Sequence, residues 1–393
     1  MLSPALRRGL MSFLAALLLI ATGFATGYAV SPRQARSEHL NLVLLVEAEE
    51  ALRDHFVSAL PPDMSLTYGM IRGMLQAVGD PYTTFVEPVS HELEEDTFSG
   101  EYGGIGAEIT QDSQGGIHLI PFDAGPADRA GIVEGDLLMQ VDGWDVALAT
   151  RLEEVAAALR GPVGSQVRIK IRQATGKGEV IALEMTRETF PLPSVTSYVS
   201  PDVRSIGVIA ISLFSDRTQE EVAQAYGQLV ERGVEALVLD LRGNPGGLLG
   251  SSVEVSRFFL GSGVILIEQY RDQEELIQRS EEPGFAAALP LAVLMDGATA
   301  SAAEVVAGAL QANGRATLIG SRTVGKGSVQ AVVELSDGSS LHITQARWLT
   351  PARDVIDGKG LAPDIEIQPG ENDPDAAMRA AIQWLLTAGD GAR

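Results

Sequence analysis

The segment Pro290-Leu-Ala-Val-Leu-Met-Asp-Gly297 runs directly into Ala298-Thr-Ala-Ser301-Ala-Ala-Glu304. The first part is a short apolar run typical of a buried strand, and the second has the Ser-x-x-Glu pattern with which many helices begin. A turn from strand to helix places Ser301 beside unpaired helix amides, which stabilise negative charge. The segment therefore predicts one strand–helix unit of an α/β core, with a candidate nucleophile at its turn.

The alternation of strand and helix extends to both sides of this segment. Apolar, β-branched runs typical of strands occur at 205–214, 236–241, 264–268, 291–295 and 317–320. Helical periodicity lies between or beside them, at 216–232, 248–260 and 301–313. This order predicts an α/β core with a largely parallel sheet.

A candidate base follows the serine, in Arg322-Thr-Val-Gly325-Lys326-Gly327-Ser-Val-Gln330. Burial lowers the pKa of a lysine amine because desolvation disfavours the ammonium form. A buried Lys326 could therefore take the proton of Ser301 and make a serine hydrolase that needs no histidine.

Both residues also have a simpler interpretation. Ser301 and Glu304 form a capping box, which by itself only begins a helix. The segment 320–326 matches the first seven positions of a phosphate-binding loop, which would make the chain a nucleotide-binding protein. Against this, Gly327 stands where that loop needs Ser or Thr, and a strand pattern follows where it needs a helix.

The surroundings of Ser301 favour catalysis. Small residues leave room for a substrate backbone next to the hydroxyl: Ala298, Ala300, Ala302 and Ala303. A second glycine turn, Asp240-Leu-Arg-Gly243-Asn-Pro-Gly246-Gly247, also ends a buried run and can present another amide to an oxyanion.

Composition excludes several classes of site. Cysteine is absent, which excludes thiolate catalysis and disulfides, and a net charge of −23 disfavours nucleic-acid binding. No Gly-x-Ser-x-Gly elbow occurs, and no His, Asp or Glu cluster has metal-ligand spacing along the chain. We expect no metal and no cofactor, and we expect His342 to be exposed on a hairpin strand.

The N-terminus has the pattern of an export segment. Arg7-Arg8 precede the apolar stretch 9–30, which Ser31-Pro32-Arg33 ends. Positive charge followed by about 20 apolar residues is typical of a signal peptide or a single membrane anchor. We expect export to the periplasm or another extracytoplasmic space, with contact to the inner membrane if residues 9–30 are retained.

Residues 38–95 show helical spacing, and an acidic link at 92–96 leads into a strand-rich block from Gly100 to Arg187. The segment 125–143, Gly-Pro-Ala-Asp-Arg-Ala-Gly-Ile-Val-Glu-Gly-Asp-Leu-Leu-Met-Gln-Val-Asp-Gly, resembles a PDZ domain in the circular order of bacterial proteases. The resemblance implies that a glycine loop holds a peptide's terminal carboxylate. That loop is Gly104, Ile105, Gly106 and Ala107. A glycine-rich hairpin without a ligand is the alternative.

Beyond the N-terminal segment, nearly the whole chain resembles the carboxyl-terminal processing peptidases, or tail-specific proteases. The segments that carry this resemblance are Tyr68-Gly-Met-Ile-Arg-Gly-Met-Leu75, Asp80-Pro-Tyr82, the PDZ-like block, 240–247, 300–308, 325–330 and Gly358-Lys-Gly-Leu-Ala-Pro-Asp364. The resemblance implies a crotonase/Clp-protease-like α/β core with an inserted PDZ domain and an N-terminal helical region.

By the same resemblance, Ser301 is the nucleophile, Lys326 the general base and Gln330 the residue that orients the lysine. Ala302 and Gly247, with Gly246 as the second choice, supply the oxyanion amides. The implied substrates are proteins or peptides with apolar C-termini. Self-association and an activating adaptor are compatible with the family, and a catalytically silent peptide-binding protein is the alternative function.

The expected domains follow these boundaries. They are 1–33 signal or anchor, 34–96 helical region, 97–187 PDZ domain, 188–370 protease core and 371–393 C-terminal helical tail. The link at 92–96 and the exit at 190–193 would let the PDZ domain act as a gate over the active site.

Overall fold

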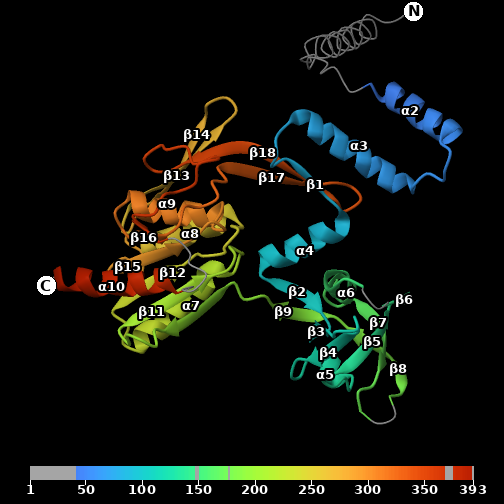
Figure 1. Ribbon diagram of the computed structural model, residues 1–393, viewed down its shortest axis with the longest axis horizontal. Helices are drawn as coiled ribbons and strands as arrows, with labels where there is room; N and C mark the ends of the chain where they lie inside the picture. Colours follow the sequence, from blue (N-terminus) through green and yellow to red (C-terminus); the bar gives the residue numbers. More distant parts are fainter. Residues whose placement is uncertain (1–40, 147–149, 176–177, 368–374, 392–393) are drawn as a thin grey trace, which may run out of the picture. The chain divides into compact units, whose positions relative to one another are not determined.

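The computed structural model describes residues 41–146, 150–175, 178–367 and 375–391 (Figure 1). The expected signal or anchor segment, 1–33, lies outside these residues. Within the described ranges, no helix has both the length and the apolar composition that crossing a bilayer requires.

Contacts divide the chain into two units, with the boundary between Met70 and Ile71. The first unit contains helix α2 (Leu42–His55) and the beginning of α3 (Asp63–Val78). Both helices are where helical spacing predicted them, and neither has a buried residue.

The centre of the second unit is a six-stranded sheet in the order β10-β11-β12-β15-β16-β19 (Figure 1). Neighbouring strands from β11 to β19 are parallel, and β10 is antiparallel at one edge. The strands are β10 (Val195–Val199), β11 (Ile206–Ile211), β12 (Ala236–Asp240), β15 (Leu291–Met295), β16 (Thr317–Gly320) and β19 (Ile365–Glu366). The expected α/β core with a largely parallel sheet is confirmed.

Helices cover both faces of this sheet. They are α7 (Thr218–Glu231), α8 (Leu249–Phe259), α9 (Ala302–Ala312) and α10 (Ala376–Gly391). Successive strand side chains point to opposite faces, so Leu237 and Leu239 pack with α7, α8 and α9, whereas Val238 packs with α10. The C-terminal helix, whose role the sequence left open, therefore covers one face of the core.

A second sheet is antiparallel and has the order β1-β18-β13-β14, with β17 also paired to β18. Its strands are β1 (Thr84–Val86), β13 (Gly263–Tyr270), β14 (Glu275–Ser280), β17 (Ser328–Glu334) and β18 (Ser340–Leu349). The run 264–268, expected among the strands of the parallel sheet, belongs here instead. An apolar run shows that a strand is buried, but it does not show which sheet the strand joins.

The strand-rich block forms its own sheet, β3-β4-β5-β7-β8, with β6 paired to β5. Val167, Ile169 and Ile171 of β7 are buried, as their alternation with basic residues predicted. The elements are β2 (Glu101–Gly104), β3 (Ala107–Gln111), β4 (Ile117–Pro121), α5 (Pro126–Arg129), β5 (Asp136–Val141), β6 (Trp144–Asp145), α6 (Leu152–Leu159), β7 (Gln166–Arg172), β8 (Val180–Thr186) and β9 (Glu188–Pro191), where β2 pairs with β9.

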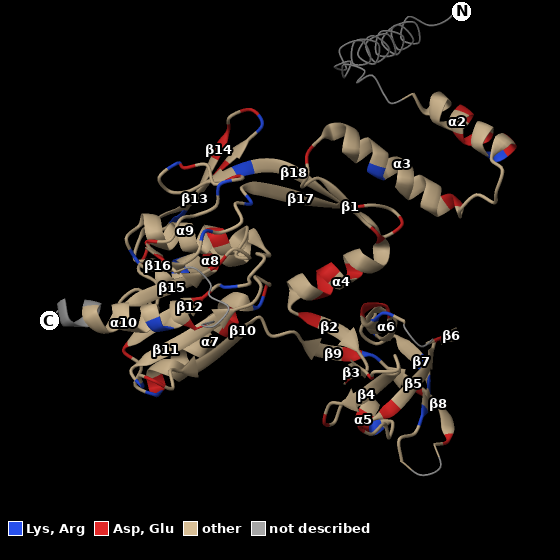
Figure 2. Ribbon diagram, viewed as in Figure 1, with Lys and Arg blue, Asp and Glu red and all other residues tan. Residues whose placement is uncertain are grey.

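The expected acidic link at 92–96 is instead part of helix α4 (Pro88–Ser99), whose acidic residues are visible in Figure 2. Pro88 begins the helix, and Gly100 ends it in the left-handed region at φ 75°. The acidic residues did not disclose the helix because a run of such residues resembles a solvated linker, although only Glu92 and Glu95 are exposed and His91 is buried. The domain boundary drawn after residue 96 thus falls inside a helix.

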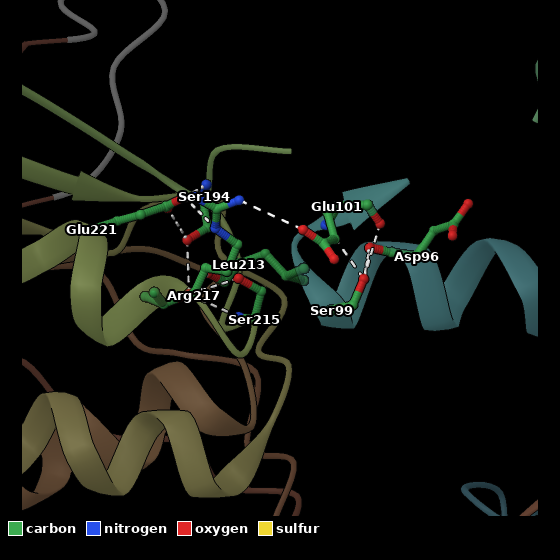
Figure 3. Close-up of polar contacts among 9 residues, drawn as sticks. Asp96, Ser99, Glu101, Ser194, Leu213, Ser215, Arg217 and Glu221 are labelled. Atoms are coloured by element: carbon green, nitrogen blue, oxygen red, sulfur yellow. Dashed lines mark hydrogen bonds and ion pairs between the residues drawn. The ribbon is translucent and has the colours of Figure 1, made fainter. Parts of the chain in front are cut away.

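Both chain segments that lead to the strand-rich block contact the start of α7, as Glu101 and Ser194 show in Figure 3, and they also contact each other. Asp216 N donates to Phe98 O at 2.8 Å, and Leu192 N donates to Gly100 O at 2.8 Å. A Cβ on Gly100 would lie 2.9 Å from Ser215 Oγ, so a side chain at position 100 would disturb this contact. The entry and exit of the block are thereby joined at one place.

Candidate active site

Ser301 lies at the turn between β15 and α9, where the sequence placed it. Its backbone has φ 53° and ψ −119°, a conformation that costs a non-glycine residue roughly 1–3 kcal/mol. Gly246 packs directly beneath it, since a Cβ on this glycine would lie 2.7 Å from Ser301 Cβ. Position 246 therefore requires glycine, because a side chain there would collide with Ser301.

Asn244 connects the two turns. Its backbone oxygen accepts from Ala300 N at 2.9 Å, and its Nδ2 donates to Ile211 O at 2.8 Å. Its Oδ1 accepts from Gly246 N at 2.8 Å, so that amide is already engaged. This leaves Gly247, rather than Gly246, as the glycine of this turn with an amide to offer an oxyanion.

Glu304 does more than cap its helix. Its carboxylate is fully buried and accepts from Ser301 N at 2.8 Å, as a capping box requires. The same carboxylate accepts from Gly325 N at 2.7 Å, from Lys326 N at 2.9 Å and from the hydroxyl of Thr323. One side chain thus holds the backbone of the serine turn against the backbone of the lysine loop.

Lys326 is half-buried and its amine is oriented. Burial lowers the pKa of this amine because desolvation disfavours the ammonium form. Its Nζ donates to Gln330 Oε1 at 3.1 Å and lies 5.7 Å from the centroid of the Tyr82 ring. Gln330 is held in turn, because its Nε2 donates to Tyr82 O.

One pocket of about 320 Å³ contains five predicted site residues. Its lining includes Ser301, Ala302, Gly247, Lys326 and Gln330. Within the described part of the chain, no hydrogen bond joins Ser301 Oγ to Lys326 Nζ. The fold therefore brings the two groups to one pocket without the direct hydrogen bond that proton transfer would use.

A second pocket of about 350 Å³ lies at the predicted glycine loop. Gly104, Ile105 and Ala107 line it, together with Arg160, whose guanidinium lies 4.6 Å from the centroid of the Tyr102 ring. Gly106 is outside this lining, although its φ of 71° shapes the loop. The pocket combines backbone groups, apolar side chains and two opposite charges, Arg160 and Glu108, and Arg160 also lies 4.0 Å from Asp96.

Three contributors to the active site were not identified from the sequence. In the sequence, Tyr82 is only part of a family motif, and Glu304 has only the position of a helix cap. His342, expected to be exposed, lines the active-site pocket with a side chain that is 13% exposed. The correction has a simple cause, because β1 and α4 cover this part of β18, with Thr84 opposite His342. These contacts join segments that are distant in sequence, so no local pattern could predict them.

Comparison with known proteins identifies the family to which the chain belongs. Peptidase family S41 matches residues 205–367, and a PDZ domain matches residues 123–173. The carboxy-terminal processing protease CtpA of Bacillus subtilis (strain 168) is 33% identical over 327 residues, which cover 82% of this chain and 68% of that protein. The chain belongs to the carboxyl-terminal processing proteases of peptidase family S41. It is a serine-type peptidase with a PDZ domain.

Two further relatives of this carboxyl-terminal processing protease cover slightly more of the chain. The carboxyl-terminal-processing protease of Synechocystis sp. (strain ATCC 27184 / PCC 6803 / Kazusa) is 34% identical over 351 residues, 86% of this chain and 81% of its own. The solved structure of a photosystem II D1 C-terminal processing protease is 32% identical, covers 86% of this chain and 96% of its own, and has a TM-score of 0.49.

Replacing Glu304 tests its connecting role. In Glu304→Gln, the amide has one acceptor oxygen for four donors and adds an NH₂ group that faces N–H groups. Each buried donor left without an acceptor costs about 1–3 kcal/mol, so we expect unfolding at a lower urea midpoint. We also expect a large fall in kcat of the protease. The matched control is Glu254→Gln on the surface of α8, where both properties should stay near the wild-type values. Wild-type turnover and stability in Glu304→Gln would contradict the role.

Proposed function

We propose that this protease cleaves peptide bonds with Ser301 as nucleophile and Lys326 as general base. The observation that carries the proposal is that both residues line one pocket in which burial lowers the pKa of the lysine amine. The hydrogen bond from Lys326 Nζ to Gln330 Oε1 orients that amine. A rotation of the two side chains toward each other would complete the dyad.

The reaction follows from these positions. Neutral Lys326 takes the proton of Ser301 Oγ as the oxygen attacks the substrate carbonyl, and it then gives that proton to the leaving amine. Water hydrolyses the resulting ester with Lys326 acting again as base. Desolvation lowers the pKa of the lysine amine, which increases its neutral fraction at any given pH.

The developing oxyanion would lie between the amides of Ala302 and Gly247. Ala302 is the first residue of α9, so its N–H has no acceptor within the helix and lies at the positive end of the helix dipole. Gly247 lines the same pocket from the neighbouring turn. Two donors from separate loops are the usual arrangement for stabilising a tetrahedral intermediate.

Nucleotide binding is the weaker alternative. A phosphate-binding loop continues into a helix, whereas the segment after Lys326 continues into strand β17. The amides of Gly325 and Lys326, which would face phosphates in such a loop, donate to Glu304 instead. The negative carboxylate at this position disfavours a phosphate.

We further propose that the PDZ domain selects substrates by their C-terminal residues. The pocket lined by Gly104, Ile105 and Ala107 suits an apolar side chain, and Arg160 adds positive charge for a terminal carboxylate. A bound tail would keep an unfolded chain attached while a distant bond enters the active site. The connection of both PDZ-flanking segments to α7 supports a further role of this domain as a gate.

Removal of either member of the dyad should abolish activity. We expect Ser301→Ala and Lys326→Ala each to lower kcat by about 1,000-fold or more, as is usual for residues that act as a unit. Ser301→Ala should also lose labelling by a fluorophosphonate probe. Lys359→Ala is the matched control, because Lys359 is also flanked by glycines but is exposed. Hydrolysis by Ser301→Ala at the wild-type rate would exclude this mechanism.

The pH dependence of kcat/KM reports the protonation state of the proposed base, Lys326. Below the pKa of Lys326 the amine is protonated and cannot accept the serine proton, so kcat/KM should rise with pH. Because burial lowers this pKa, the rise should level off below the value of about 10.4 for a free lysine. A profile that stays flat from pH 7 to 9 would show that a different group is the base.

Tail recognition can be tested with two unfolded substrates that differ only in their last residues. We expect an apolar tail to give a KM at least about tenfold lower than an acidic tail, equivalent to roughly 1.4 kcal/mol of binding, with similar kcat. A variant lacking residues 101–191, from β2 to β9, should lose this preference. The turnover of short peptides by this variant then distinguishes two roles. If the domain is a gate, its removal changes that turnover, and if the domain is a simple tether, the turnover stays the same. Equal KM values for both tails in the complete protein would refute recognition by the PDZ domain.

A further inference from the structure

A second cluster of chemically reactive side chains adjoins the active-site pocket. His91 and Glu94 lie one turn apart on α4, and His342 lies opposite them on β18. One ligand atom from each of these residues lies within 4.8 Å of the other two. The sequence could not indicate this group, because its third member is far from the first two along the chain.

The polar atoms of this cluster are buried and lack hydrogen-bond partners. Among the described residues, this holds for His91 Nδ1, Glu94 Oε2 and His342 Nε2 alike. The last two atoms lie 3.2 Å apart, which is an ion-pair distance if His342 is protonated, but their geometry is not that of a hydrogen bond. His91 as a whole is only 6% exposed. Unpartnered buried polar atoms are costly, so three that converge on one point indicate a missing partner that all of them could bind.

We propose that His91 Nδ1, Glu94 Oε2 and His342 Nε2 bind a divalent transition-metal ion, with Zn²⁺ as the best fit. Two imidazoles and one carboxylate form a ligand set that zinc accepts, whereas Ca²⁺ and Mg²⁺ prefer oxygen ligands alone. Three protein ligands leave a coordination position for water.

The surroundings of His91 support this assignment. A histidine that binds metal through one ring nitrogen commonly directs the other toward a carboxylate. Glu95 Oε1 lies 3.6 Å from His91 Nε2. The carboxylate of Glu95 therefore favours a proton on Nε2, which leaves Nδ1 with a free electron pair directed at the cluster.

The ion would fasten α4 to β18. His342 lies opposite Val332 of β17, the strand that also carries Gln330, and β17 and β18 form one wall of the active-site pocket. Phe98, at the other end of α4, lines the same pocket. The proposed ion would therefore link the helix that leads into the PDZ domain to the strands that support the lysine.

Zinc binding by the complete, metal-free protein tests the proposal. We expect one equivalent of Zn²⁺ to compete with a chromogenic chelator, and Ca²⁺ in excess not to displace it. His342→Gln should weaken Zn²⁺ binding by more than about 100-fold, since even outer-sphere partners of a zinc site contribute about 10–100-fold. Co²⁺ in place of Zn²⁺ should produce visible absorption bands in the wild type and lose them in this variant.

The control is His118→Gln. His118 also lies beside a carboxylate, 2.9 Å from Asp112, but within the PDZ sheet. This variant should bind Zn²⁺ like the wild type. If His342→Gln proves misfolded by circular dichroism, Glu94→Gln, whose side chain is 39% exposed, gives the same test. Equal Zn²⁺ affinity in the wild type and in the folded cluster variant, or no Zn²⁺ binding by the wild type, would overturn the proposal and leave a plain Glu94–His342 ion pair.

Discussion

The rest of the proposed active site depends on the hydrogen bonds that the Glu304 carboxylate accepts. This carboxylate belongs to α9 but accepts hydrogen bonds from Ser301 of its own turn and from Thr323, Gly325 and Lys326 of another loop. A fully buried carboxylate is costly unless donors surround it, and charge-assisted bonds to backbone amides are among the stronger hydrogen bonds in proteins. Ser301 and Lys326, the proposed nucleophile and base, are consequently positioned by one shared acceptor.

The parallel sheet makes this arrangement possible. β12 and β15 are adjacent and parallel, so the turns that follow them emerge at the same edge of the sheet. Asn244 joins these two turns, and the close approach of Gly246 leaves the serine backbone little freedom. The unfavourable backbone conformation of Ser301 is thus maintained by packing from a segment that is distant in sequence.

Much of this site could be predicted because its chemistry is local. Ser301 is followed by a helix start within four residues, and Lys326 and Gln330 lie in one short segment. Most helices and strands followed from periodicity and glycine turns, and the PDZ-like block followed from the resemblance of segment 125–143 to a known family. The position of β13 did not follow, because its apolar run suits either sheet. The continuation of α4 through residues 92–96 to Ser99 was also hidden, because a run of acidic residues resembles a linker.

By itself, the sequence determined the residue types, the α/β order, the PDZ-like block and the serine–lysine candidates, since each depends on neighbours within a few residues. Only the tertiary structure decided that Glu304 connects two loops, that Gly246 is engaged while Gly247 faces the pocket, and that His342 meets His91 and Glu94. Those facts depend on which strands become neighbours and which side chains lose water. Both are set by the packing of segments that no local pattern relates to one another.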